Sequence, residues 1–168
     1  AECSLNGVSM LNRSQIADTT CIMAHRAPAS ASRQMFRNVL AEKSQGVFQG
    51  LIRVAKPAQR TDATQQIKAM LLSPHAAQNS KPELEILADD VKCAHGASVG
   101  QLDEAALFYL RARGIDEAQA RALLIGAFLE DAVAQIQAGA AQNAEQIQQN
   151  IQATISAWLS QKLVNENV

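Results

Sequence analysis

The chain has 168 residues, enough for one ordinary domain or one and a half small ones with a hydrophobic core of their own. Its 15 basic and 16 acidic residues leave a formal charge of -1, so no global field favours nucleic acid or an anionic membrane as a partner. Cys3, Cys21 and Cys93 are odd in number and irregularly spaced, which argues against a secreted disulfide framework and predicts a reducing compartment, by default the cytoplasm. No apolar run approaches the roughly 20 residues that cross a bilayer, which predicts a soluble chain.

From Ala1 to about Gly100, short apolar runs alternate with Gly, Ser, Asn, Pro and charged residues. Their length, β-branching and flanking breakers predict five strands, in the runs CIMAH, MFRNVL, VFQGLIRV, QIKAMLL and LEILADDV. The centres of these runs recur about every 15 to 20 residues, without amphipathic helices between them. This recurrence favours a β-helix, in which each rung completes its core by stacking on its neighbours, over the alternative of a β-sandwich.

After Gly100 the composition changes to good helix formers, Ala, Leu, Gln and Glu. Asp103 is placed to cap a first helix, which ends before Gly114. Asp116 is placed to cap a second helix that runs to about Ile136, with Gln119 positioned for a capping box. Its predicted apolar stripe is Leu124, Phe128, Val133 and Ile136. The run AGAA, residues 138–141, predicts a break before a third helix, whose stripe is Ile147, Ile151, Ile155, Trp158, Leu159 and Leu163. The predicted domains are therefore 1–100 and 101–168.

The segment DDVKCAHGASVG places a thiol, Cys93, two residues before an imidazole, His95. On a regular strand Asp89, Val91, Cys93 and His95 share one face, and Val91 indicates that this face belongs to the core. Spacing alone favours a structural role, because a buried cysteine usually packs as a small hydrophobe. A C-x-H pair supplies at most two ligands, where zinc or a cluster iron usually has four coordination positions. Any metal site here needs further ligands from elsewhere.

Residues Ser80 to Phe128 resemble the C-terminal part of the SufB/SufD family of iron–sulfur cluster assembly proteins, and within it most closely the SufD members. Their sequence is SKPELEILADDVKCAHGASVGQLDEAALFYLRARGIDEAQARALLIGAF. The motifs KPELEI, ADDVKCAHGA, VGQLDE and FYLRARGI follow in order with family-like spacing, and VFQGLIRV with TDATQQ extends the likeness upstream. The resemblance implies a right-handed parallel β-helix followed by a helical domain. Because complete members have an N-terminal helical region and more rungs, the chain is expected to be the C-terminal portion of such a protein.

The resemblance also implies a function, that of a non-catalytic scaffold subunit. Cys93 and His95 are then associated with nascent cluster assembly at the interface with a SufB-like partner, so the cluster is transient and shared, and none is expected in this chain alone. The helical domain is expected to dock a SufC-like ABC ATPase, since the chain has no Walker A pattern of its own. The candidate docking residues are Leu107, Phe108, Tyr109, Leu110 and Arg111.

Two other classes of function stay open. The chain is alternatively a passive module that only anchors the ATPase, with Cys93 and His95 structural. A β-helix carbohydrate enzyme is the third class, but Asp89 and Asp90 as neighbours on a strand would point to opposite faces, and aromatic residues make up only 4% of the chain.

The remaining histidines and thiols are assigned no function. His25 and His75 are expected in surface or turn positions, and Cys3 and Cys21 as buried or incidental thiols. An uncovered terminal rung also predicts self-association of the chain.

Overall fold

The computed structural model describes residues 1–135 and 143–165, with side chains described up to residue 161. Its contacts divide the described chain into two compact units, Ala1–Gly100 and Gln101–Val168, the second including the residues outside that description. No helix in the described ranges is long and apolar enough to cross a membrane.

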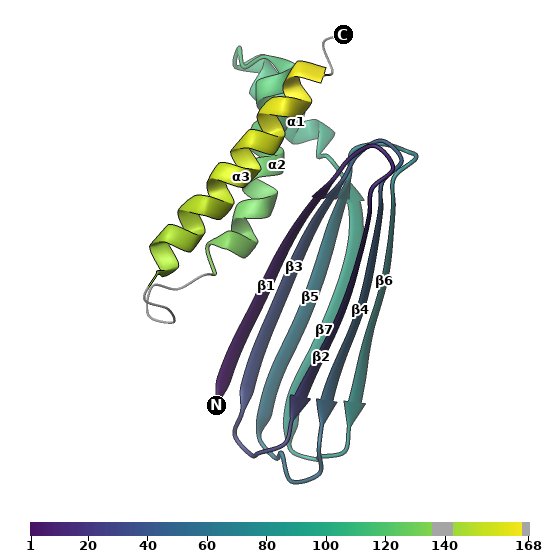
Figure 1. The fold of residues 1–168 in the computed structure, drawn as a ribbon, viewed down its shortest axis with the longest axis vertical. Coiled ribbons are helices and arrows are strands. Elements are labelled where there is room, and N and C mark those ends of the chain that lie inside the picture. Colours follow the sequence, from purple (N-terminus) through teal and green to yellow (C-terminus); the bar gives the residue numbers. More distant parts are fainter. Residues whose placement is uncertain (136–142, 166–168) are drawn as a thin grey trace. The chain divides into compact units, whose positions relative to one another are not determined.

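The first unit contains seven strands in two parallel sheets. One sheet has the order β1-β3-β5-β7 and the other β2-β4-β6, and their arrows point in opposite directions in Figure 1. The strands are β1 (Glu2–Leu11), β2 (Ile16–His25), β3 (Ala31–Leu40), β4 (Gln45–Val54), β5 (Thr61–Leu71), β6 (Ala77–Ile86) and β7 (Val91–Gln101). The unit is therefore a β-solenoid with two strands per turn. Strands β1 to β6 make three turns, and β7 begins a fourth.

The parallel register confirms the predicted β-helix and excludes the sandwich. Glu2 pairs with Ala31, 29 residues on, and Gln45 pairs with Ala77, 32 residues on. One turn is therefore about twice the interval expected from the apolar runs, because each turn holds two strands. Four of the five predicted runs lie in β2, β3, β4 and β5, one in each strand. Only QIKAMLL extends beyond its strand, by one residue.

The run LEILADDV was wrongly predicted as one strand. It begins in β6, passes through a turn and reaches only the first residue of β7. Ala88 in this turn is buried against the solenoid core, so the run is apolar although it is not extended. Strand β1 and most of β6 were not predicted, because their outward-facing residues are largely polar and leave no continuous apolar run.

Inward-facing side chains of the two sheets form the core. Phe36 and Phe48 contact each other with ring centroids 4.6 Å apart, and Ile67 completes their cluster. A second cluster consists of Ile52, Val54, Ala58, Ala63 and Ala88. In β4 and β5 the buried positions alternate with more exposed ones, as half-buried strands require, whereas Ala58 and Ala88 lie in turns.

The second unit contains helices α1 (Glu104–Ala112), α2 (Glu117–Val133) and α3 (Ala144–Asn165). The predicted caps are confirmed: Asp103 Oδ1 accepts from the backbone N–H groups of Ala105 and Ala106, at 2.9 and 3.0 Å, and Asp116 Oδ1 accepts from that of Gln119 at 3.0 Å. Gly114 has a φ of +88°, as a C′ residue needs.

The buried face of α2 shares only Val133 with the described part of the predicted stripe. Ala120, Ile125, Leu129, Ala132 and Val133 are buried, whereas Leu124 and Phe128 are only half-buried. In α3, Ile155 is buried but Ile147 is 42% exposed. Ile136, the predicted break at 138–141 and the side chain of Leu163 lie outside the described part of the chain.

Candidate functional site

Strand β7 is one of the two edge strands of the four-stranded sheet, and β1 is the other. Strand β7 is paired with β5 on one side, and no described strand pairs with its other side. Val91 and Cys93 are half-buried and pack against the core cluster that includes Ile52 and Ala63, so odd-numbered residues of β7 face inward. His95 continues this row but is exposed. The structure therefore places Cys93 and His95 on one face of an unpaired edge, while Asp89 lies outside the strand in the preceding turn.

The surroundings of Cys93 keep its thiol protonated. Burial raises the pKa of this thiol most, and the nearby Asp62 carboxylate raises that pKa further, against the opposing effect of the Ala63 backbone N–H. Any thiophilic metal that binds here must therefore displace a proton.

The number of ligands at this edge limits what it can hold. Within residues 1–135 and 143–161, no three His, Cys, Asp or Glu side chains are grouped so that they could hold a metal ion. A thiolate and an imidazole suit iron by their chemistry, but they fill only two coordination positions. Cys93 and His95 by themselves therefore leave at least two coordination positions of such a metal unfilled.

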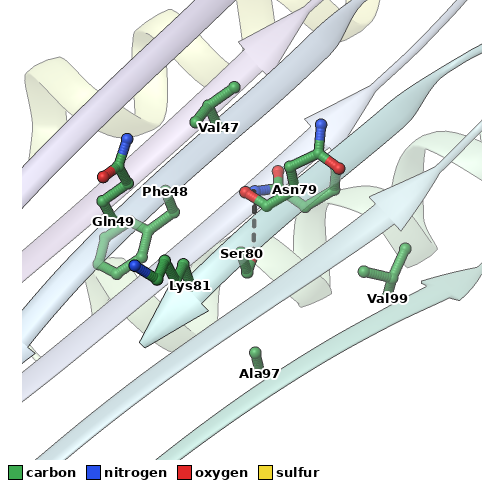
Figure 2. A pocket seen from close by; sticks show the side chains of 9 residues that line it. Val47, Phe48, Gln49, Asn79, Ser80, Lys81, Ala97 and Val99 are labelled. Carbon is green, nitrogen blue, oxygen red and sulfur yellow. Dashed lines mark hydrogen bonds between the residues drawn. The ribbon is translucent and has the colours of Figure 1, made fainter. Parts of the chain in front are cut away.

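A recess lies in the last turn, beside Ala97 and Val99 of β7 (Figure 2), which continue the row of Cys93 and His95. It has a volume of about 550 Å³, and Ala97 and Val99 of β7 line it together with residues of β4 and β6. Gln78 lies in its wall, held by Asn38, whose Nδ2 donates to Gln78 Oε1 at 2.8 Å. The edge of β7 thus combines unpaired backbone groups with a partly apolar hollow.

Asp89 and Asp90 belong to the turn that leads into β7. The backbone N–H of Arg60 donates to the backbone carbonyl oxygen of Asp90 at 2.6 Å. The backbone N–H of Asp90 donates to Gln59 Oε1 at 2.9 Å. These hydrogen bonds connect one solenoid turn to the next. The backbone at Asp90 therefore has a structural role.

The candidate docking residues of α1 lie in different environments. Leu107 is buried and Leu110 half-buried in the helical unit. Phe108 is 74% exposed and Tyr109 56% exposed, with the Arg113 guanidinium carbon 4.4 Å from the Tyr109 ring centroid. Arg111 is exposed and forms an ion pair with Glu117 at 3.2 Å. The two aromatic residues thus form the accessible apolar part of this set.

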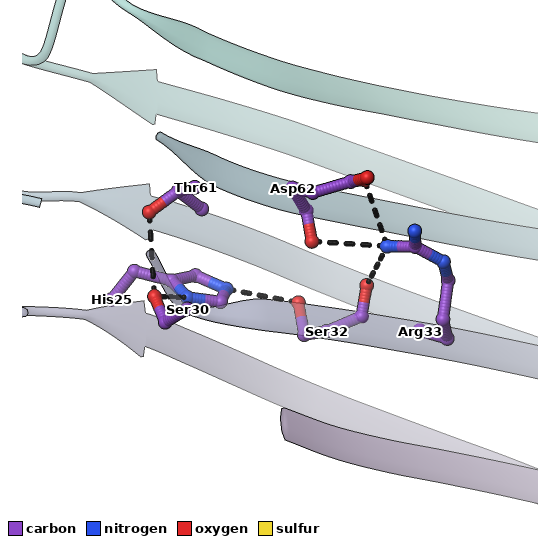
Figure 3. Close-up of polar contacts among 6 residues, drawn as sticks. All are labelled: His25, Ser30, Ser32, Arg33, Thr61 and Asp62. Carbon is purple, nitrogen blue, oxygen red and sulfur yellow. Dashed lines mark hydrogen bonds and ion pairs between the residues drawn. The ribbon is translucent and has the colours of Figure 1, made fainter. Parts of the chain in front are cut away.

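His25 was wrongly predicted to lie at the surface or in a turn. It is the last residue of β2 and is only 6% exposed. Figure 3 shows its ring between two hydroxyls, with Nδ1 2.7 Å from Ser30 Oγ and Nε2 2.9 Å from Ser32 Oγ. Burial lowers the pKa of His25. His75, in contrast, is exposed in a turn, as expected.

We expect His25 to make the solenoid less stable in acid. Its folded-state pKa lies below the ordinary value of 6.5, so the unfolded chain binds the proton first. The contribution is fully present above pH 6.5 and decreases as the pH falls from there toward the lowered pKa. Urea unfolding at a series of pH values measures it. His25→Gln should flatten this part of the profile and His75→Gln should not; equal profiles for all three proteins would contradict the assignment.

Two buried glutamines were not identified by the sequence analysis. Gln34 and Gln65 face the inside of the solenoid and are 2% and 0% exposed. Gln65 Nε2 donates to Gln34 Oε1 at 2.9 Å, and Cys21 Sγ donates to the same oxygen at 3.2 Å. Nothing in the local sequence distinguishes them from surface glutamines, except that Gln65 alternates with the inward-facing Ala63 and Ile67.

The chain is similar to proteins of known family. The family model "SUF system FeS cluster assembly, SufBD core domain" matches residues 1–128. The iron–sulfur cluster assembly protein SufD of Escherichia coli is 40% identical over 124 residues, which cover 74% of this chain and 29% of that protein. A SufBD family protein of Synechocystis is 41% identical over 129 residues, or 77% of this chain and 28% of that protein.

A chloroplast protein is also similar to this chain. The protein ABCI7 of Arabidopsis thaliana is 50% identical over 102 residues, which are 60% of this chain and 22% of that protein. The chain thus spans less than a third of the length of these curated relatives. Because the family model covers both the solenoid and most of α2, the chain belongs to the SufB/SufD family of iron–sulfur cluster assembly proteins and is SufD-like.

Proposed function

We propose that this chain is part of a non-catalytic scaffold subunit that supports nascent iron–sulfur cluster assembly at an interface with a SufB-like partner. The observation that carries the proposal is the placement of Cys93 and His95 in one row of an unpaired edge strand, in a chain of this family. The cluster is the cargo of this site. Its remaining ligands come from the partner, since the chain offers two.

The same edge supports pairing with another chain. Unpaired N–H and C=O groups along β7 can accept a strand from a partner, and the neighbouring recess can receive apolar side chains from it. Incomplete ligation on each side lets the cluster leave when the interface opens. Without a SufB-like partner, a second copy of this chain is expected to occupy the edge. The free cysteines suit a reducing compartment, which we take to be the cytoplasm.

The test is to introduce His95→Ala into the full-length protein and to produce it anaerobically with its SufB-like and SufC-like partners. We expect iron and acid-labile sulfide per complex to fall about tenfold or more, in an intact complex, because a ligand is lost. His75→Ala is the matched control, since His75 is an exposed histidine in the turn between β5 and β6 and is not part of β7. Unchanged cluster content in His95→Ala would leave Cys93 and His95 as structural residues, and would favour the passive module.

The helical unit provides the second half of the proposal, the docking of a SufC-like ATPase. Phe108 and Tyr109 expose aromatic surface on α1, and aromatic residues are enriched among those that dominate binding energy. Phe108→Asp should weaken binding by roughly 30-fold, which corresponds to about 2 kcal/mol. Titration calorimetry with the isolated ATPase measures this loss.

Leu123→Asp is the matched control for this docking test. Leu123 is 50% exposed on α2, so the change removes an exposed apolar side chain outside the candidate set. Equal losses in both variants would show that α1 has no special role. If neither variant loses affinity for the ATPase, the docking surface lies elsewhere on the protein.

A further inference from the structure

Inside the solenoid, the amide pair Gln34 and Gln65 has unsatisfied hydrogen-bonding groups. Gln34 Nε2 and Gln65 Oε1 are buried and have no hydrogen-bond partner among the described residues. A buried polar atom without a partner is unfavourable, and most buried side-chain polar atoms are paired. The free oxygen of Gln65 therefore needs an explanation.

The Gln65 side chain is held firmly in its position. Its Nε2 is engaged by Gln34, and its amide lies against the bare backbone of Gly50, where an added Cβ would collide with it. Gly50 has no side chain that could donate a hydrogen bond. The free Oε1 is thus a fixed acceptor inside the last complete turn.

Gln65 and His95 belong to the same inward-facing layer of neighbouring strands. Cys93 lies beside Ala63, whose backbone N–H interacts with its thiol, and both residues belong to one packed cluster. Gln65 and His95 each follow two residues later on the parallel strands β5 and β7. Because side chains alternate with a period of two, these residues occupy the next layer together.

We infer that Gln65 is the positioning residue of His95. When the imidazole turns toward the inside of the solenoid, one ring N–H donates to Gln65 Oε1. The other ring nitrogen is then unprotonated and available to an iron atom. A histidine that binds a metal commonly donates its second N–H to a fixed acceptor, which selects the tautomer and orients the ring. This inference rests on the proposed function, in which His95 is a ligand.

The tautomer of His95 tests the inference without any cluster. The full-length protein, labelled with 15N in its histidines, is bound to an unlabelled SufB-like partner, and the ring nitrogen shifts of His95 are assigned with His95→Gln. The expected spectrum has one protonated and one unprotonated nitrogen. Gln65→Met should average the two shifts toward those of a free histidine, and Gln65→Glu, which keeps an acceptor, should restore the single tautomer.

Ile67→Val is the matched control. It loosens the same solenoid core but leaves both amides of the Gln34 and Gln65 pair in place. Unchanged His95 shifts in Gln65→Met would overturn the inference. So would an equal change in Ile67→Val, because the effect would then come from general loosening of the core.

Iron content separates this inference from the proposed function. Loss of the positioning residue should reduce iron retention by the partnered complex about tenfold, the lower part of the range for such contacts. If Gln65→Met changes the tautomer but neither it nor His95→Ala changes the iron content, the hydrogen bond exists and the proposed function fails. If His95→Ala removes iron while Gln65→Met leaves both tautomer and iron unchanged, only the role of Gln65 fails.

Discussion

Replacing Phe48 by Ala is expected to destabilise the solenoid by about 3 to 5 kcal/mol, the range for removing a large buried aromatic side chain. Phe48 is 1% exposed and contacts the Phe36 ring from the opposite sheet, so the change leaves a cavity between the two sheets. Parallel strands around this cavity are fixed by their register and can collapse only partly. A loss of this size is a large fraction of the stability of an ordinary domain.

The measurement must follow the solenoid itself. The only tryptophan of the chain, Trp158, lies in α3, so its fluorescence reports on the helical unit. Hydrogen exchange of the β3, β4 and β5 amides, with far-ultraviolet circular dichroism in urea, reports on the sheets. Phe108→Ala is the matched control and should change stability by less than about 0.5 kcal/mol, because Phe108 is 74% exposed. Equal effects of the two substitutions would contradict the assigned core.

Replacing Gly50 by Ala is expected to cost roughly 2 to 4 kcal/mol, although it adds a single methyl group. The new Cβ would overlap with the Gln65 amide and would lie 2.5 Å from Phe48 Cε1. Moving the amide breaks its bond to Gln34, and moving the ring disturbs the pair with Phe36. Both shifts are opposed by a close-packed interior.

Gly96→Ala is the control for this substitution. Gly96 lies in β7 and has open space around the position of a Cβ, so Ala should be tolerated and should slightly stabilise the strand. Urea unfolding of both variants, followed by circular dichroism, compares them directly. If Gly50→Ala is as stable as Gly96→Ala, the amide pair is not packed as described. Recovery of stability in Gly50→Ala combined with Gln65→Ala would support the collision as the cause.

The Cys93 and His95 pair could be found from sequence, but its setting could not. The two-residue spacing places both side chains in one row of any strand, which is a local property. That β7 is an edge strand depends on which strands pair, and pairing joins residues about 30 positions apart. Gln65 was missed for the same reason. Its significance comes from Gln34 and Gly50, which lie on other strands.

The sequence by itself determined the local features: the helix ends at Asp103, Gly114 and Asp116, the central strands, and the family to which its motifs belong. Capping and alternation are decided by residues a few positions apart, so they can be predicted from a short window. Only the tertiary structure decided that His25 is buried and that Leu107 packs while Phe108 is exposed. Burial depends on which distant elements come together, because the hydrophobic effect acts on the surface removed from water and not on the order of residues along the chain.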